Sequence, residues 1–325
     1  MTSASTFAVR AATADDERQV LALLAASLQW VPDELFAQFF AWKHRAGPFG
    51  TSPAWVAVDG DRIVGFRTFL RWEFEADDGR TRRAVRAVDT ATHPDYQGRG
   101  IFRTLTLHAL AELRADGVDF VFNTPNDKSR PGYLTMGWRE VGRVPTAVRP
   151  VSVAGAVRML RSRVPADRWS AGGEQGLPAA EVLADDRISG LRPALAKTGI
   201  RTRRGSDYLR WRYGFGALGY RAVVLDGDVR NGVAVFRRRR RGRAVEAALC
   251  DVLVPRDAPG NARRLERAVA AACAADYVVK LGGPLADGAG FVRLPRQGPV
   301  LTWRALNQSD APTAWRLALG DVELF

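Results

Sequence analysis

The sequence of 325 residues predicts an α/β (α+β) fold, in which a mixed, twisted sheet is flanked by helices, in two tandem copies. Three observations lead to this fold class. A strand with alternating side chains leads through a glycine-rich loop into an amphipathic helix, and a second buried strand follows that helix. Several features of the first half then recur in the same order in the second half, as in an internal repeat.

The first strand is predicted at residues 84–92, where side chains alternate with period two until Pro94 ends the strand. The helix is predicted to begin near Gly100 and to stop at Gly117. Its apolar face recurs at every third or fourth residue and consists of Phe102, Leu105, Ala109 and Leu113. This spacing is typical of a helix that packs one face on a sheet.

The loop between them, Gln97-Gly-Arg-Gly100, is suited to holding an anion. Glycine has no Cβ to keep a ligand away from the main-chain N–H groups. The following helix adds the positive end of its dipole, which stabilises a bound anion by about 0.3–2 kcal/mol. The loop therefore predicts a cofactor site that binds a pyrophosphate.

This stretch resembles the acyl-CoA loop of the GNAT superfamily of N-acyltransferases, whose pattern is Gln/Arg-x-x-Gly-x-Gly/Ala. Gln97 and Gly100 match the pattern, whereas Phe102 stands where the family usually has Gly or Ala. The resemblance implies that acetyl-CoA, or another acyl-CoA, is the co-substrate. The residues that it places at the cofactor are Ala91, Thr92, His93, Gln97, Gly98, Arg99, Gly100, Ile101, Phe102 and Arg103.

A second segment extends the resemblance downstream. Residues 120–123 predict the next buried strand, and the segment from Asn126 to Trp138 looks like the family's Asn-x6-Tyr-x3-Gly-Phe/Trp segment. The resemblance implies that Asn126 contacts the pantetheine arm and that Tyr133 donates a proton to the departing thiolate. A phenol with the usual pKa of about 10 keeps its proton at neutral pH, which suits this role. The alternative is a tyrosine that only packs on a helix face.

The other elements of the first 150 residues fit around these pieces. They are an edge strand at 7–10, a helix from Thr13 to about Leu28, an aromatic-rich helix at 30–42 beside the acceptor pocket, and a hairpin of strands 55–58 and 63–74 turned by Asp59-Gly60. Most of the aromatic side chains at 30–42 are expected to be core residues.

The internal repeat rests on three matches in order. Residues 56–65 are echoed by residues 223–232, and each segment contains Asp-Gly-Asp. An aromatic and basic helix precedes each segment, at 39–43 and at 208–212. Behind each comes a strand with an aspartate ahead of a proline; the aspartates are Asp89 and Asp251. The recurrence of this aspartate leaves open a structural role for Asp89.

We therefore expect a catalytic domain at 1–150, a linker with the start of the second domain at 151–204, and a degenerate copy at 205–325. In that copy Arg256-Asp-Ala-Pro-Gly-Asn261 replaces the glycine loop, and its proline removes an amide while its acid repels phosphate. One cofactor site is therefore expected. The other elements predicted here are helices at 154–163, 188–197 and 261–275, a loop at 171–178, strands at 277–281 and 300–305, and an apolar, docked tail at 315–325.

The chain has 48 Lys and Arg against 35 Asp and Glu, a formal net charge of +13. The excess is almost wholly arginine, because the lysines are only Lys43, Lys128, Lys197 and Lys280. The densest run, residues 237–243, falls where a solvated hairpin turn is predicted, and no aromatic residues are interleaved with it for base stacking. We therefore do not expect a nucleic-acid partner.

No metal is expected, since Cys250 and Cys273 with three histidines make neither a disulfide framework nor a ligand set. The first seven residues lack the charged and apolar regions of a signal peptide, and no apolar run reaches the length of a membrane span. These features predict a cytoplasmic protein.

The function that the resemblance implies is N-acyl transfer by direct attack of a primary amine, from a small molecule or a peptide, on the thioester. Main-chain amides of residues 91–93 are expected to hold the thioester oxygen and the pantetheine. The base that takes the amine proton is expected to be Asp89, with His93 and the carboxylate of Phe325 as alternatives. An ordinary Asp has a pKa near 4, so this role needs a relaying water or burial that raises the pKa.

Two rival classes of function remain. One is a non-catalytic acyl-CoA-binding or partner-binding module, which does not need a phenol at Tyr133. The other is a basic nucleic-acid-binding protein. The sequence names neither the acceptor nor the length of the acyl chain, and it leaves the oligomeric state open.

Overall fold

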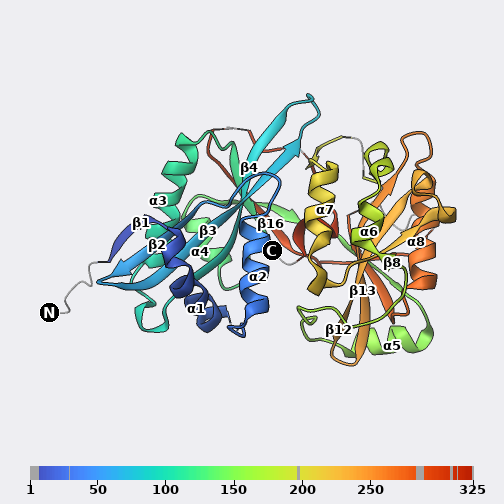
Figure 1. Cartoon of the computed structure of the whole chain (residues 1–325), viewed down its shortest axis with the longest axis horizontal. Coiled ribbons are helices and arrows are strands. Elements are labelled where there is room, and N and C mark those ends of the chain that lie inside the picture. The colour runs from blue at the N-terminus through green and yellow to red at the C-terminus, as the bar shows by residue number, and fades with distance from the viewer. Residues whose placement is uncertain are drawn as a thin grey trace. The chain divides into compact units, whose positions relative to one another are not determined.

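The computed structural model describes residues 7–28, 30–195, 198–282, 289–307, 310–312 and 314–323. Contacts within the chain divide it into two compact units (Figure 1). The first unit combines the described residues of Met1–Gly142 with those of Val300–Pro312, and the second combines those of Arg143–Pro299 and Thr313–Phe325. Each unit contains one mixed sheet. The predicted division at residues 150 and 204 stays a prediction.

The sheet of the first unit runs in the order β1-β2-β3-β4-β5-β16-β6. Its strands are β1 (Ala8–Ala11), β2 (Ala54–Asp59), β3 (Arg62–Glu75), β4 (Thr81–Thr92), β5 (Phe120–Asn123), β16 (Val300–Ala305) and β6 (Arg139–Arg143). Strands β1 to β4 are antiparallel neighbours, whereas β4 and β5 run parallel. The parallel pair needs a crossover, and helix α3 (Ile101–Ala115) supplies it.

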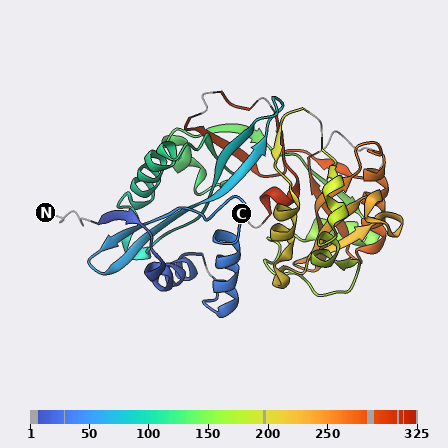
Figure 2. The ribbon, with the colours of Figure 1, turned by 45° about the horizontal axis from the view of Figure 1, so that its top comes forward.

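Helices cover both faces of this sheet (Figure 2). Helices α1 (Glu17–Leu28) and α2 (Glu34–His44) lie on one face, while α3 and the short α4 (Arg130–Thr135) lie on the other. The alternation along β2 sets the two faces: Val56 packs with the α1 core, and its neighbours Trp55 and Ala57 pack with the α3 core. Each face is therefore apolar, as expected of a sheet buried on both sides.

The predicted elements of this unit are confirmed, with shifts at their ends. Strand 84–92 is the second part of β4, and strand 120–123 is β5. The aromatic-rich helix starts at Glu34 rather than at residue 30, because the side chain of Asp33 accepts a hydrogen bond from the N–H of Phe36 at 2.8 Å and caps it there.

One predicted strand belongs to the sheet of the first unit, although it was expected in the second copy. Residues 300–305 do form strand β16, but β16 pairs antiparallel with β5, with Thr302 opposite Asn123. The order of elements along the chain predicted this strand for the second copy. Local side-chain alternation locates a strand but carries no information on its partner, so the sequence could not make this assignment.

The sheet of the second unit runs in the order β15-β7-β14-β13-β12-β11-β8, and β9 also pairs with β13. Its strands are β7 (Thr146–Pro150), β8 (Leu177–Pro178), β9 (Arg192–Pro193), β11 (Arg221–Val224), β12 (Val233–Arg241), β13 (Ala244–Val254), β14 (Tyr277–Leu281) and β15 (Val292–Leu294). Strands β10 (Ile200–Thr202) and β17 (Trp315–Arg316) pair with each other in parallel. The helices are α5 (Val153–Arg161), α6 (Ala179–Leu183), α7 (Ser206–Gly214), α8 (Asn261–Ala272) and α9 (Leu319–Val322).

The second unit repeats the central arrangement of the first. Strands β13 and β14 run parallel and are joined by α8, as β4 and β5 are joined by α3. Strand β12 is the antiparallel neighbour of β13, as β3 is of β4. Two mixed sheets flanked by helices therefore confirm the predicted fold class.

The helix expected at 188–197 is wrong. The chain forms a short 3-10 helix at Asp186–Gly190 and then strand β9, which pairs with β13. The side chain of Asp185 accepts a hydrogen bond from the N–H of Arg187 at 2.9 Å and starts the 3-10 turn, and Pro193 cannot donate the hydrogen bond of a helix interior. Lys197 lies outside the described residues.

Among the described residues, no helix is long and apolar enough to cross a membrane. The same residues contain no group of His, Cys, Asp and Glu side chains that could hold a metal ion.

Candidate functional site

Strands β4 and β5 separate at the centre of the first sheet. Their parallel pairing ends at Arg86 opposite Phe122, while β4 continues to Thr92. Beyond that point the described strands pair with β4 on its β3 side only, with Ala91 opposite Phe66. The main chain of the last residues of β4 therefore borders an opening in the sheet, where the sequence placed the thioester.

A bulge bends β4 at this opening. Phe66 on β3 lies opposite Ala91 on β4, and Thr68 lies opposite Val88. Between these pairs β3 has one residue, Arg67, whereas β4 has two, Asp89 and Thr90. Asp89 has a φ of +36°, in the left-handed region that residues other than glycine seldom adopt. Such strain persists only where surrounding contacts hold it, which makes the bulge a candidate functional feature.

The glycine loop lies at the end of this opening. Gly98 has a φ of +75° and Gly100 a φ of +78°, so both need the freedom of glycine. A Cβ added at either position would meet no atom within 4 Å, which means that the space beside the loop is open. Gly100 is also the N-cap of the 15-residue helix α3 and brings no side chain to cap the first turn. An exposed loop of this kind, at a helix N-terminus, fits a pyrophosphate.

Phe102 departs from the family pattern without filling the loop. Its ring packs edge-on against Tyr133, with 5.4 Å between ring centroids. A Cβ added at Gly132 would lie 3.1 Å from the Phe102 ring, so glycine at 132 makes room for it. The larger side chain therefore contacts α4.

Tyr133 is fixed by its surroundings. The residue is 3% exposed, and its ring also packs beside Trp138 at 5.0 Å between centroids. Its phenol oxygen accepts a hydrogen bond from Nη1 of Arg67 at 2.8 Å. Sequence reasoning missed Arg67, whose only signal was a charged residue inside the apolar run of strand 63–74.

Asn126 holds the turn that leads into α4. Its side-chain oxygen accepts hydrogen bonds from the N–H groups of Lys128 at 3.1 Å and Ser129 at 2.9 Å. The side-chain oxygen of Asn126 is therefore already used in hydrogen bonds within the turn. A contact of Asn126 with pantetheine stays a prediction and would use the amide nitrogen of the side chain.

Asp89 faces α2 on the other side of the sheet from Tyr133. Its Oδ2 lies 2.7 Å from Nζ of Lys43 and 2.8 Å from Nε2 of His44, whose Nδ1 lies 3.1 Å from the Ser52 hydroxyl. Burial alone would raise the pKa of Asp89, but Lys43 and His44 outweigh burial and lower that pKa. Burial lowers the pKa of His44 more than Asp89 raises it.

The lowered pKa of Asp89 removes one premise for its role as a direct base. A carboxylate whose pKa is lowered accepts a proton less readily, whereas a direct base role needed burial to raise the pKa. Asp89 as the base stays a prediction, in the form that acts through water. Of the alternatives, His93 has Nε2 at 2.6 Å from Nη2 of Arg62, and Phe325 lies outside the described residues.

The second unit uses the matching aspartate in a similar way. Asp251 on β13 accepts hydrogen bonds from the hydroxyl of Tyr213 on α7 and from Nε of Arg204, the latter at 3.0 Å. In both units the strand aspartate therefore contacts the aromatic and basic helix that precedes the hairpin. The parallel supports a role in holding this helix on the sheet.

The opening between β13 and β14 differs from the one between β4 and β5. A cavity there is lined by residues of β13, β14 and α8 and by the chain's own segment 315–319. Gly320 follows directly, and a Cβ added there would lie 3.2 Å from the main-chain oxygen of Cys250. The C-terminal segment thus packs along the edge of β13 that corresponds to the candidate site.

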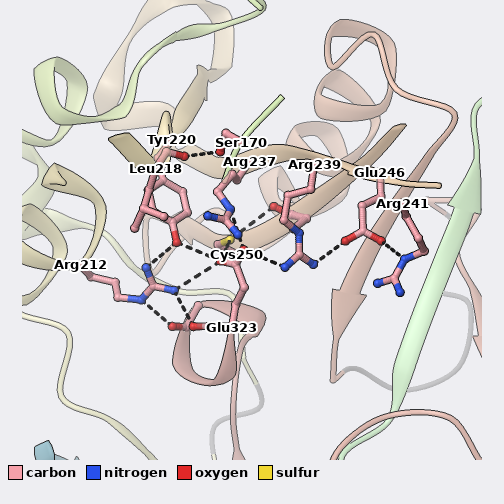
Figure 3. Close-up of polar contacts among 12 residues, drawn as sticks. Ser170, Arg212, Leu218, Tyr220, Arg237, Arg239, Arg241, Glu246, Cys250 and Glu323 are labelled. Atoms are coloured by element: carbon pink, nitrogen blue, oxygen red, sulfur yellow. Dashed lines mark hydrogen bonds and ion pairs between the residues drawn. The ribbon is translucent and has the colours of Figure 1, made fainter. Parts of the chain in front are cut away.

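A buried cluster of charges anchors this segment (Figure 3). The Glu323 carboxylate is 2% exposed and lies 2.7 Å from Nε of Arg237 and 3.4 Å from Nη1 of Arg239 and Nη2 of Arg212. Tyr220 donates a hydrogen bond to the same carboxylate at 2.9 Å. The expected docking of the tail is therefore confirmed for its described residues.

The same cluster corrects the prediction for the arginine run. Residues 237–241 lie on β12 rather than in a solvated turn, and the Arg237 side chain is 0% exposed. Glu246 on β13 binds Arg239 and, at 2.7 Å, Nε of Arg241. Glu246 on the neighbouring strand and Glu323 far along the chain thus compensate much of this run.

Comparison with known proteins gave one family match. Residues 8–141 match the family model described as an acetyltransferase (GNAT) domain. The search of curated proteins found no match.

Solved structures of similar fold extend over most of this chain. A GCN5-related N-acetyltransferase from Anabaena variabilis aligns with a TM-score of 0.60 at 12% identity, over 93% of this chain and 73% of that chain. A probable N-acyltransferase from Enterococcus faecalis aligns with a TM-score of 0.58 at 11% identity, over 93% and 73%. Eis1 from Mycobacterium abscessus aligns with a TM-score of 0.55 at 14% identity, over 92% and 74%. At these identities the likeness is one of fold.

Proposed function

Because residues 8–141 carry a GNAT-type acetyltransferase domain, we propose that the protein is an N-acyltransferase that moves an acetyl or other acyl group from acyl-CoA to a primary amine. The observation that carries this proposal is the open loop of Gly98 and Gly100 at the N-terminus of α3, beside the opening between β4 and β5. The acceptor is a small-molecule or peptide amine, and the protein acts in the cytoplasm.

Different residues around the opening bind different parts of acyl-CoA. Main-chain N–H groups of residues 97–103 bind the pyrophosphate, and the free edge of residues 91–93 binds the pantetheine and the thioester oxygen. Acyl-CoA supplies the thioester carbonyl and the thiolate leaving group. Tyr133, whose ring packs in the core on the α3 side of the sheet, gives the departing sulfur its proton.

On the other face, Asp89 and the aromatic residues of α2 form the acceptor side. A small cavity there is lined by Trp30, by residues of α1 and α2 that include Lys43, and by Asp89. Asp89 orders a water that takes the amine proton, and its ion pair with Lys43 and its hydrogen bond with His44 keep α2 against β4.

Replacing Gly100 by Glu should abolish acyl-CoA binding while the fold is retained. The φ of +78° is strained for any side chain, and the new carboxylate would repel the pyrophosphate from the loop. Isothermal calorimetry with coenzyme A would measure the loss, and circular dichroism would check the fold. Gly79→Glu is the matched control, because Gly79 has a φ of +75° in the hairpin between β3 and β4, and this variant should bind coenzyme A normally. Unchanged affinity of Gly100→Glu would mean that the loop is only a turn.

Coenzyme A should bind once per chain, in the first unit. The second unit has Pro259 in the corresponding loop, and its own segment 315–319 lines the opening beside β13. Calorimetry should therefore give a stoichiometry near one, and hydrogen exchange should show protection at residues 97–103. Two equivalent sites, or protection at residues 256–261, would contradict this expectation.

A further inference from the structure

The first unit buries a cation that has no anionic partner in the part of the chain that the structure describes. The Arg67 side chain is fully buried, and its Nε and Nη2 atoms have no hydrogen-bond partner among the described residues. None of the carboxylates in the described part of the chain lies within ion-pair distance of it. Burying an unpaired charge is costly, so proteins seldom keep one without a use.

Among the described residues, aromatic rings surround the Arg67 guanidinium and the Tyr133 phenol is its polar partner. Aromatic faces surround the guanidinium: its central carbon lies 4.3 Å from the centre of the Phe69 ring and 5.7 Å from that of Phe102. Its single polar contact in the described residues is the hydrogen bond from Nη1 to the Tyr133 phenol oxygen, at 2.8 Å. Arg67 is the β3 residue at the bulge between β3 and β4.

This hydrogen bond fixes the direction of the phenol proton. Arginine has no acceptor, so in this contact the phenol oxygen must accept and its own O–H must point elsewhere. We propose that Arg67 is a positioning residue that holds the Tyr133 hydroxyl as the proton donor to the departing thiolate and stabilises the tyrosinate left behind. This inference rests on the proposed acyl transfer.

The chemistry explains why a cation is useful there. The amine lone pair forms the C–N bond, the C–S bond then breaks with its electron pair on sulfur, and the phenol O–H proton passes to that sulfur. An ordinary phenol has a pKa of about 10 and an ordinary thiol about 8.5, so such a transfer is unfavourable by a factor of about 30. A guanidinium on the phenol oxygen favours the negative charge that the transfer leaves there. The proton lost from the amine to the base is returned to the tyrosinate through solvent.

A double-mutant cycle tests this inference. Arg67→Met should lower kcat by about 10- to 10³-fold with coenzyme A affinity nearly unchanged, because the cation acts only as charge develops. In a Tyr133→Phe background the same substitution should change kcat by less than about 3-fold, because the group through which Arg67 acts is gone. Arg67→Lys should recover part of the loss, since it keeps the charge without the fixed fork of donors.

Methionine is chosen because an apolar side chain of similar length fills a buried arginine site without creating an unpaired group. The matched control is Arg86→Met, on β4. Arg86 is also buried, but it donates a hydrogen bond to the Thr124 hydroxyl at 2.8 Å. The effect of Arg86→Met on kcat should be the same in the parent protein and in the Tyr133→Phe background. Thermal unfolding of each variant separates loss of fold from loss of turnover.

The outcomes are distinct. A folded Arg67→Met variant with the parent kcat, or an equal loss of kcat in both backgrounds, overturns the role of Arg67 and leaves the proposed function standing. If Arg67→Met does not fold, the effect of Arg67→Lys on kcat is compared in the parent protein and in the Tyr133→Phe background, and an equal loss in both overturns the role of Arg67. If the parent protein releases no thiol from acyl-CoA with any amine, the proposed function fails and this inference fails with it.

Discussion

Tyr133→Phe is expected to lower turnover by about 10- to 10⁴-fold, because general acid catalysis contributes about 10²- to 10⁴-fold and a water can replace the phenol in part. The hydroxyl acts as the thiolate develops, so the loss should fall on kcat rather than on acyl-CoA affinity. The ring stays and keeps its packing against Phe102 and Trp138. Steady-state kinetics by thiol release, with coenzyme A affinity from calorimetry, measures both quantities.

The substitution also removes the acceptor of Arg67, which costs about 1–3 kcal/mol of stability when a buried donor is left unpaired. Turnover must therefore be measured well below the melting temperature of the variant. Parent turnover in a folded Tyr133→Phe protein would mean that the proton comes from another group. It would also favour the rival interpretation of Tyr133 as a packing residue in an acyl-CoA-binding module.

Glu323→Gln is expected to destabilise the second unit by about 3–5 kcal/mol, the cost of removing one partner of a buried ion pair. The amide keeps the shape of the carboxylate but leaves Arg237, which is 0% exposed, without its negative partner. Denaturant unfolding monitored by circular dichroism would measure the loss. Asp257→Asn is the control, because Asp257 is exposed in the loop after β13 and its loss should change stability by less than about 0.5 kcal/mol. A Glu323→Gln protein as stable as the control would contradict the anchoring role of the cluster.

The same carboxylate should make this unit sensitive to acid. Burial alone would raise the pKa of Glu323, but Arg237, Arg239 and Arg212 outweigh it and lower the pKa to about 2. A group whose pKa is lower in the folded state contributes stability above its unfolded pKa, near 4.3, and loses it as the pH falls toward 2. Unfolding of the parent protein should therefore become easier between about pH 4 and pH 2. In Glu323→Gln, the free energy of unfolding should fall by about 3 kcal/mol less over this pH range than it does in the parent protein.

The sequence predicted the elements whose pattern is local. Strands β5 and β14 have the predicted ends, since runs of apolar residues between turn signals mark both. The pattern could not assign β16 to a sheet, because strand pairing depends on residues far along the chain. The helix expected at 188–197 is wrong because Asp185 starts a 3-10 turn and Pro193 belongs to strand β9.

The sequence indicated only those parts of the candidate site that lie in local motifs. The loop of residues 97–100 and Tyr133 belong to short motifs, so the sequence alone indicated them. Arg67 and the Asp89 ion pairs join residues of different elements, and the arginine run is compensated by Glu323, far along the chain. Partners of this kind are fixed by the fold, and one sequence gives little sign of them.

The central claim is that this chain transfers an acyl group from acyl-CoA at the Gly100 loop to an amine. The most direct test is thiol release from acetyl-CoA and longer acyl-CoAs across a panel of amino sugars, amino acids, peptide amines and aminoglycosides, with Gly100→Glu run in parallel. We expect release by the parent protein that requires one class of amine and is absent from Gly100→Glu. Equal release from the two proteins, or no amine-dependent release by the parent with any acyl-CoA, would contradict the account.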